Sequence, residues 1–136
     1  MSIERFEHDH GEIHAGIHEL RKLIATGIER NAAPITQLLL AMSASIKLHL
    51  AVEDRVVYPA FMASTQPAMQ ALGRSYQEEM GGIAQRYMEF ARRWNLANRV
   101  AAQPDAFRAE ANDVFKALFL RTRREEAELY PAYAKL

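Results

Sequence analysis

The 136-residue chain carries 17 basic side chains (Lys and Arg), 17 acidic ones (Asp and Glu) and no cysteine. This balance leaves no net field that would draw the protein onto nucleic acid or an anionic membrane. The missing cysteine excludes disulfides and thiolate ligands, so histidine and carboxylate are the strong metal ligands that remain. We expect one domain over residues 1–136, because a chain of this length buries one core but divides poorly.

The amino-terminal residues lack the apolar stretch of a secretory signal, and we expect no apolar run near the roughly 18 residues that a membrane span requires. The sequence therefore predicts a soluble, cytoplasmic protein with no membrane partner and no nucleic-acid partner.

Apolar residues recur every three or four positions in long segments, which is the spacing of a helix that buries one face. The first segment begins near Ile3 and has His10 on its apolar stripe. The second begins near Pro34 and has His49 on its inner face. Pro59 is expected to kink or end this second helix, because proline removes a backbone donor and clashes with the preceding turn.

A third apolar pattern runs from Pro67 to Trp94 and includes Met80, and a fourth follows Pro104 and includes Arg121. Strand signals are weak, because no segment alternates apolar and polar residues and no Asn-Gly or Asp-Gly turn occurs. Short connections make neighbouring helices antiparallel. The sequence predicts an all-α fold, an up-down-up-down antiparallel four-helix bundle.

The second half of the chain repeats the first. His49–Phe61 aligns without gaps with Arg121–Tyr133, and Glu, Tyr, Pro and Ala recur in register. A shorter likeness upstream pairs His10 with Met80. The chain thus resembles two helical hairpins, and the histidines of the first hairpin have no histidine counterparts in the second.

Three pairs of polar residues are spaced four apart: His10 and His14, His49 and Glu53, and Arg121 and Glu125. Residues four apart lie on the same face of a helix, and these pairs fall at a similar height along antiparallel helices. Imidazoles and carboxylates on facing helices can bind a metal ion inside a bundle. A single His-x-x-x-Glu spacing is common by chance, but its place on a core stripe and its repetition before Tyr-Pro make the signal stronger.

The predicted ligand set has three nitrogen and two oxygen donors: His10, His14, His49, Glu53 and Glu125. It is compatible with a mononuclear site that keeps one position open, and it suits Fe, Mn or Zn.

These residues resemble the haemerythrin and HHE cation-binding domains over nearly the whole chain. The resemblance implies a four-helix bundle with a non-haem di-iron centre, in which one His and one His-x-x-x-Glu from each hairpin serve each iron and the glutamates bridge. His10, His49, Glu53 and Glu125 match that pattern. The Tyr-Pro pairs that follow both glutamates match its helix ends.

Met80 and Arg121 depart from the family pattern, and both departures fall on the same iron. A thioether is a poor ligand for ferric iron, and a guanidinium cannot deprotonate to ligate. A second metal is therefore not expected. Arg121 can instead supply a fixed positive charge there and pair with Glu125 or Glu53.

Each candidate also has a plainer interpretation. A histidine on an apolar face can be a hydrogen-bonded core residue, and a salt bridge to Arg121 would satisfy Glu125 without a metal. His14 can donate a hydrogen bond to a ligand or lie at the edge of the interface. Tyr58 and Tyr130 are expected to pack near the helix ends with their hydroxyls at the boundary, or to hydrogen-bond a carboxylate.

The leading hypothesis is a haemerythrin-like metal-binding protein with a reduced, mononuclear non-haem iron site, or a Zn or Mn site, that binds or senses O2, NO or iron and can form a homo-oligomer. The alternative is a metal-free helical-bundle interaction or scaffold module in which Arg121 replaces the metal. An enzymatic role ranks third, since no residue pair defines a nucleophile with its base and no Gly-rich phosphate loop occurs.

Overall fold

The computed structural model of the chain describes residues 3–136, and within that range it contains helices and no strand. The elements in chain order are α1 (Ile3–Ala25), α2 (Ala32–Val52), η1 (Glu53–Val57), α3 (Tyr58–Met62), α4 (Pro67–Arg93), α5 (Ala97–Ala102), α6 (Pro104–Arg124), η2 (Glu125–Leu129) and α7 (Tyr130–Ala134). The elements η1 and η2 are single π-helical turns that join α2 to α3 and α6 to α7 without a break.

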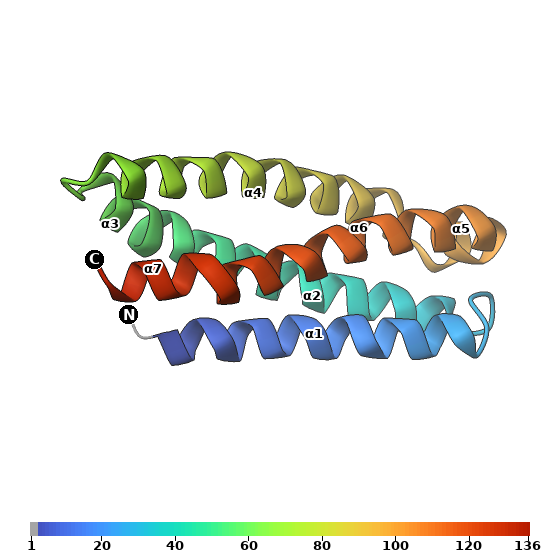
Figure 1. Ribbon diagram of the computed structural model, residues 1–136. Coiled ribbons are helices and arrows are strands. Elements are labelled where there is room, and N and C mark those ends of the chain that lie inside the picture. The colour runs from blue at the N-terminus through green and yellow to red at the C-terminus, as the bar shows by residue number, and fades with distance from the viewer. Residues whose placement is uncertain (1–2) are drawn as a thin grey trace.

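The long helices run up and down side by side, and the start of α1 lies at the same end of the bundle as α7 (Figure 1). The all-α, antiparallel bundle that the sequence predicts is confirmed. The tight turn between α1 and α2 contains Gly27, whose positive φ of 124° is a conformation that residues with a Cβ rarely adopt. Pro67 and Pro104 stand at the first positions of α4 and α6, where the absent N–H costs no helical hydrogen bond.

Two features differ from the sequence prediction. The short helix α5 lies between the third and fourth long helices, and its buried Val100 joins the main core. At Pro59, where the sequence predicts a kink or an end, the second long helix does not end but continues to Met62, because the π-helical turn η1 widens the backbone just before the proline. The same arrangement recurs at Pro131.

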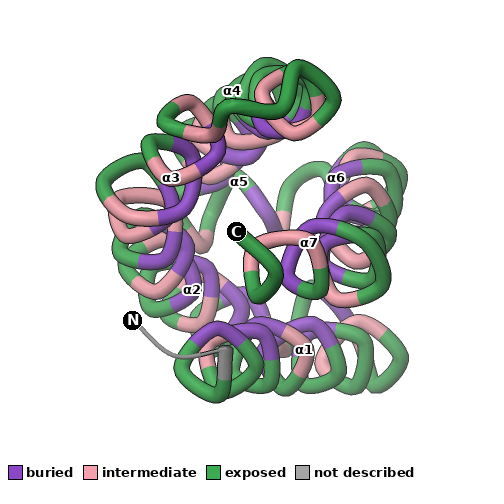
Figure 2. Tube along the Cα trace, turned by 60° about the vertical axis from the view of Figure 1, so that its left-hand side comes forward, coloured by how far each residue is buried: buried purple, intermediate pink, exposed green. Residues whose placement is uncertain are grey.

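The core consists of two apolar clusters with a polar layer between them, and the buried residues line the inside of the bundle (Figure 2). On α1, Phe6 belongs to one cluster and Ile13 to the other, and buried His10 lies between them in sequence. On the fourth long helix, Leu118 and Leu129 similarly bracket the layer. The buried polar residues of this layer are His10, His49, Glu53, Arg121, Thr122 and Glu125.

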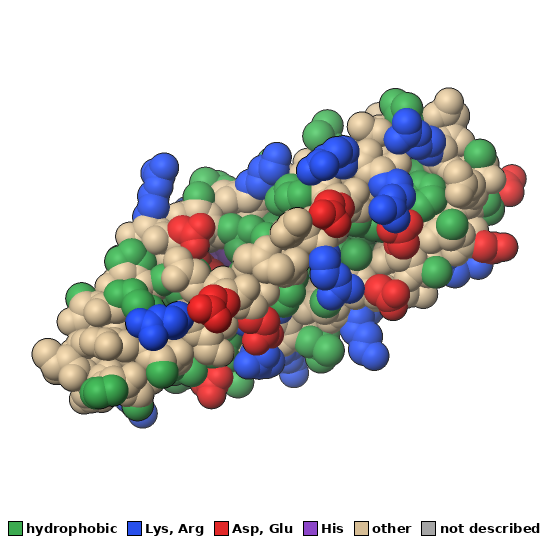
Figure 3. Space-filling view, turned by 90° about the horizontal axis from the view of Figure 1, so that it is seen from above, with side chains coloured by type: hydrophobic (Ala, Val, Ile, Leu, Met, Phe, Trp, Pro, Cys, Tyr) green, Lys and Arg blue, Asp and Glu red, His purple; other side chains and the backbone are tan. Residues whose placement is uncertain are grey.

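The continuous helix Ala32–Met62 is long and apolar enough to cross a membrane by length and composition. The sequence expectation that no apolar run approaches this length is therefore wrong for this helix. Its inner face nevertheless carries His49 and Glu53 into the polar layer, and core helices of bundles have the same composition. Acidic and basic side chains are interspersed on the face of the molecule shown in Figure 3.

Candidate metal centre

Four of the predicted ligands meet inside the polar layer. His10 comes from α1, His49 from the last turn of α2, and Glu53 and Glu125 are the first residues of the two π-helical turns. All four are buried, and one donor atom from each lies within 4.8 Å of the donor atoms of the other three. This is the convergence of nitrogen and oxygen donors that the helical spacing predicts.

The donor atoms approach one another closely. His49 Nε2 lies 2.7 Å from Glu53 Oε1, and His10 Nε2 lies 3.0 Å from Glu125 Oε1. The two imidazole Nε2 atoms are 3.1 Å apart. A buried group of Lewis bases at these separations needs a positive charge among them, which either protons or a metal ion can supply.

A second carboxylate contacts the Nδ1 atom of each imidazole. His10 Nδ1 lies 3.0 Å from Glu126 Oε1, and His49 Nδ1 lies 3.3 Å from Asp9 Oδ2. Because an ionised carboxylate only accepts hydrogen bonds, each Nδ1 donates and each Nε2 is turned toward the centre. Histidine ligands of metals are commonly oriented in this way. Sequence reasoning missed Asp9 and Glu126, although each is the direct neighbour of a predicted ligand.

The π-helical turns bring two tyrosines into the same layer. The Tyr58 N–H donates to the Glu53 carbonyl, and the Tyr130 N–H donates to the Glu125 carbonyl, so five residues complete each turn. Glutamate and tyrosine therefore share a face, which they would not do five residues apart in a regular α-helix. Both tyrosine hydroxyls are thus in the interior and not at the boundary. The Tyr58 hydroxyl donates to Glu53 Oε2 at 2.9 Å.

Burial sets the electrostatics of the metal-free cluster. It raises the pKa of Glu53, and it raises the pKa of Tyr58 and Tyr130, so both phenols keep their protons. Burial also opposes the charged form of His49, but hydrogen bonds to Glu125 and Glu53 outweigh it and raise the pKa of His49 to about 10. The metal-free cluster therefore holds a proton on this imidazole at neutral pH, in the place where a metal would bind.

Glu125 is the one predicted ligand from the second hairpin; burial opposes its charged form, but hydrogen bonds to His10 and His49 outweigh burial and hold the pKa of Glu125 below the usual range. Its Oε2 faces the other way, and Arg121 Nε lies 3.6 Å from it. Among the described residues, Glu125 Oε2 and Arg121 Nε and Nη1 are buried without a hydrogen-bond partner. The Glu125 carboxylate thus lies between the imidazoles and the guanidinium of Arg121, which is always charged.

Arg121 fills the space on the far side of Glu125. One Nη donates to the Tyr76 carbonyl at 2.5 Å, and the other lies 3.3 Å from Glu79 Oε1. The guanidinium carbon lies 4.2 Å from the centre of the Tyr76 ring, a cation–π distance. Met80 is buried in the apolar cluster and is a core residue.

His14 is not brought into the group. Its Nε2 lies 2.7 Å from Thr122 Oγ1, and its ring centre is 6.3 Å from that of His10. The structure therefore assembles His10, His49, Glu53 and Glu125 from the predicted set and leaves His14 one helical turn away.

The fold and this buried layer together define a helical-bundle protein whose His/Glu cluster fits a metal-binding site. The family model described as the hemerythrin HHE cation binding domain matches residues 1–133, and the chain belongs to that family. Comparison with curated proteins gave no match, and comparison with solved structures gave none.

Proposed function

We propose that the protein binds one non-haem metal ion, iron before Zn or Mn, and that it serves to bind or sense O2, NO or iron. The observation that carries this proposal is the convergence of His10, His49, Glu53 and Glu125 within 4.8 Å in a buried layer. Imidazole with carboxylate suits iron, manganese and zinc, and the absence of cysteine disfavours softer ions.

The environment of the second hairpin supports one ion and not two. Where the family has imidazoles for a second iron, this chain has Met80 in the apolar core and the guanidinium of Arg121. A second cation near Glu125 Oε2 would lie beside a fixed positive charge, which Coulomb repulsion disfavours. Reversible O2 carriage of the usual haemerythrin kind takes an electron from each of two irons, so sensing or storage fits a single ion better.

Around the ion, residues of the chain would orient the ligands and keep bulk water out. Asp9 and Glu126 hold the imidazoles with Nε2 inward, and Phe6 stacks on Tyr130 at 4.9 Å between ring centres and covers the layer from the apolar side. A bound ion would supply a Lewis-acidic and, for iron, a redox-active centre. The protein contributes ligand orientation and exclusion of bulk water.

Elemental analysis of the purified protein, repeated on His49→Ala and His14→Ala, tests this proposal. We expect one metal ion per chain in the unchanged protein, none in His49→Ala, and one in His14→Ala, whose imidazole lies outside the cluster. More than one tightly bound ion per chain would refute the single-site proposal.

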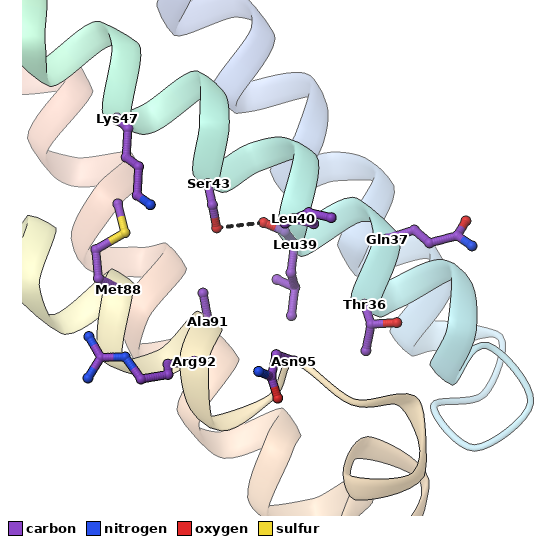
Figure 4. A pocket seen from close by; sticks show the side chains of 10 residues that line it. All are labelled: Thr36, Gln37, Leu39, Leu40, Ser43, Lys47, Met88, Ala91, Arg92 and Asn95. Atoms are coloured by element: carbon purple, nitrogen blue, oxygen red, sulfur yellow. Dashed lines mark hydrogen bonds between the residues drawn. The ribbon is translucent and has the colours of Figure 1, made fainter.

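A specific observation favours one alternative, the metal-free interaction module. A groove of about 480 Å³ lies between α2 and α4, and exposed Leu40 lines it together with Lys47, Met88 and Arg92 (Figure 4). Such a groove can receive a partner, and Arg121 already gives Glu125 a cationic neighbour. This alternative predicts a melting temperature that does not change with chelator or with excess metal, whereas a ligand of the folded state must raise it.

A further inference from the structure

The hydroxyl of Tyr130 contacts all four candidate ligands. Its oxygen is 2.9 Å from His10 Nε2, 2.9 Å from Glu53 Oε1, 3.3 Å from His49 Nε2 and 3.4 Å from Glu125 Oε1. The side chain is buried, and Phe6 stacks on its ring. The Tyr130 oxygen thus lies within hydrogen-bond distance of one nitrogen or oxygen atom from each of the four candidate ligands.

These contacts exceed what a hydrogen-bonding tyrosine requires. A phenol has one hydrogen, so it donates to one of the four atoms, and the other three face the lone pairs of its oxygen. A structural tyrosine in a core is normally satisfied by one partner for its hydroxyl. The position of the oxygen matches instead that of a further donor directed at the same point as the imidazoles and carboxylates.

Tyr58 provides an internal comparison, because it occupies the equivalent position of the first hairpin. Its hydroxyl donates to Glu53 Oε2, the carboxylate oxygen that is not the one nearest to His49. Within the described part of the chain, the Tyr58 hydroxyl forms no hydrogen bond with either imidazole or with Glu125. The two tyrosines of the repeat therefore have different surroundings, and of the two only Tyr130 has its hydroxyl oxygen within hydrogen-bond distance of all four candidate ligands.

We propose that Tyr130 is a fifth protein ligand of the metal and binds ferric iron through its deprotonated phenolic oxygen. This inference rests on the proposed metal-binding function. On binding, the O–H bond breaks, its proton passes to solvent, and the oxygen lone pair forms the bond to iron; no electron is transferred. Anionic oxygen suits a hard trivalent cation.

Charge counting narrows the choice of metal without deciding it. Glu53, Glu125 and the phenolate supply three negative charges, which Fe(III) alone balances. A divalent ion leaves one negative charge, which the guanidinium of Arg121, 3.6 Å from Glu125 Oε2, can balance. The preference for ferric iron therefore comes from the affinity of a hard trivalent cation for anionic phenolate oxygen.

Visible absorption of the protein loaded with one equivalent of Fe(III) tests this inference, with total iron measured on the same samples. Phenolate bound to ferric iron gives a charge-transfer band in the visible region, and imidazole and carboxylate bound to a single ferric ion do not. We expect the band in the unchanged protein and in Tyr58→Phe, and its loss in Tyr130→Phe. We also expect Fe(III) affinity to fall about tenfold or more in Tyr130→Phe, because loss of even an outer partner of a ligand costs roughly 10- to 100-fold.

The outcomes separate this inference from the proposed function. Iron bound without a visible band, or a band that survives in Tyr130→Phe or vanishes in Tyr58→Phe, would overturn the Tyr130 assignment and leave the metal site standing. Failure of the unchanged protein to bind iron, zinc or manganese would overturn the proposed function, whereas binding of zinc or manganese without iron would overturn the Tyr130 assignment alone. If Tyr130→Phe does not fold, resonance Raman spectra of the Tyr58→Phe protein with ring-deuterated tyrosine decide the matter: tyrosine ring modes that shift with deuteration support the assignment, and their absence overturns it.

Discussion

The two hairpins of the bundle share one backbone plan but carry different charges at equivalent places. Both have a glutamate at the start of a π-helical turn, followed by Tyr and Pro. The first hairpin places the imidazoles of His10 and His49 beside its glutamate, whereas the second has Met80 and Arg121. The comparison shows two ways of placing a group that can carry positive charge beside a buried glutamate: an imidazole in the first hairpin and a guanidinium in the second.

Restoring the imidazoles of the second hairpin should have the largest effect. The double variant Met80→His/Arg121→His removes the fixed cation beside Glu125 Oε2 and adds an imidazole at each of the two positions where the family has one. We expect elemental analysis to give two metal ions per chain in place of one. The matched control Met80→Leu/Arg121→Met should not exceed one, and a double-histidine variant that also stays at one would show that the two hairpins differ by more than these ligands.

Removing only the cation should destabilise the metal-free protein. Arg121→Met leaves Glu125 Oε2 buried without its charged neighbour, and breaking a buried pair in this way costs about 3–5 kcal/mol of the free energy of unfolding. Arg124→Met is the control, because half-exposed Arg124 also contacts Glu79 but as a surface pair, worth about 0–1 kcal/mol. Urea unfolding measures both, and equal small losses would contradict a compensating role for Arg121.

The first hairpin should make stability depend on pH in the alkaline range when no metal is bound. The pKa of His49 is raised to about 10, above its ordinary value near 6.5 in the unfolded chain. Its contribution to stability is therefore fully present below about pH 6.5 and is lost as the pH rises through about 10. We expect urea unfolding of the metal-free protein to show this loss, and His49→Gln to show a flatter profile. A variant with the same slope as the unchanged protein would rule out His49 as the source.

The smallest expected effect on stability is at the two glycines that follow equivalent positions of the two hairpins. Gly11 follows His10 and Gly81 follows Met80, and an added Cβ would meet no atom within 4 Å at either glycine. Each change to alanine should raise the free energy of unfolding by about 0.5–1 kcal/mol, because glycine costs more backbone entropy within a helix. Thermal unfolding of both variants should give similar gains, and a loss at either position would show that its helix needs the glycine.

Helical periodicity was sufficient to predict the bundle and the inward direction of His10, His49, Glu53 and Glu125, because residues three and four apart share a face. It could not predict the position of Tyr130, since a five-residue π-helical turn shifts the face that follows it. The same rule placed His14 on the face of His10, but the height at which it meets Thr122 depends on the packing of α6 against α1. This packing depends on tertiary contacts, which leave no pattern in the local sequence.

The backing carboxylates illustrate a second limit. Asp9 and Glu126 orient the two imidazoles from neighbouring positions in the chain. In sequence they look like ordinary exposed acids, and only the rotation of α1 and η2 about their axes turns them toward the rings. The family resemblance predicted the four candidate ligands that meet in the structure but not the carboxylates that orient the two imidazoles.

The most direct measurement is a titration of the metal-free protein with iron, with bound and free metal separated by equilibrium dialysis. The account predicts saturation at one ion per chain in the unchanged protein and no tight binding in His49→Ala. Saturation at two ions per chain, or binding that persists without His49, would contradict the central claim that the first hairpin and Glu125 enclose a single cation.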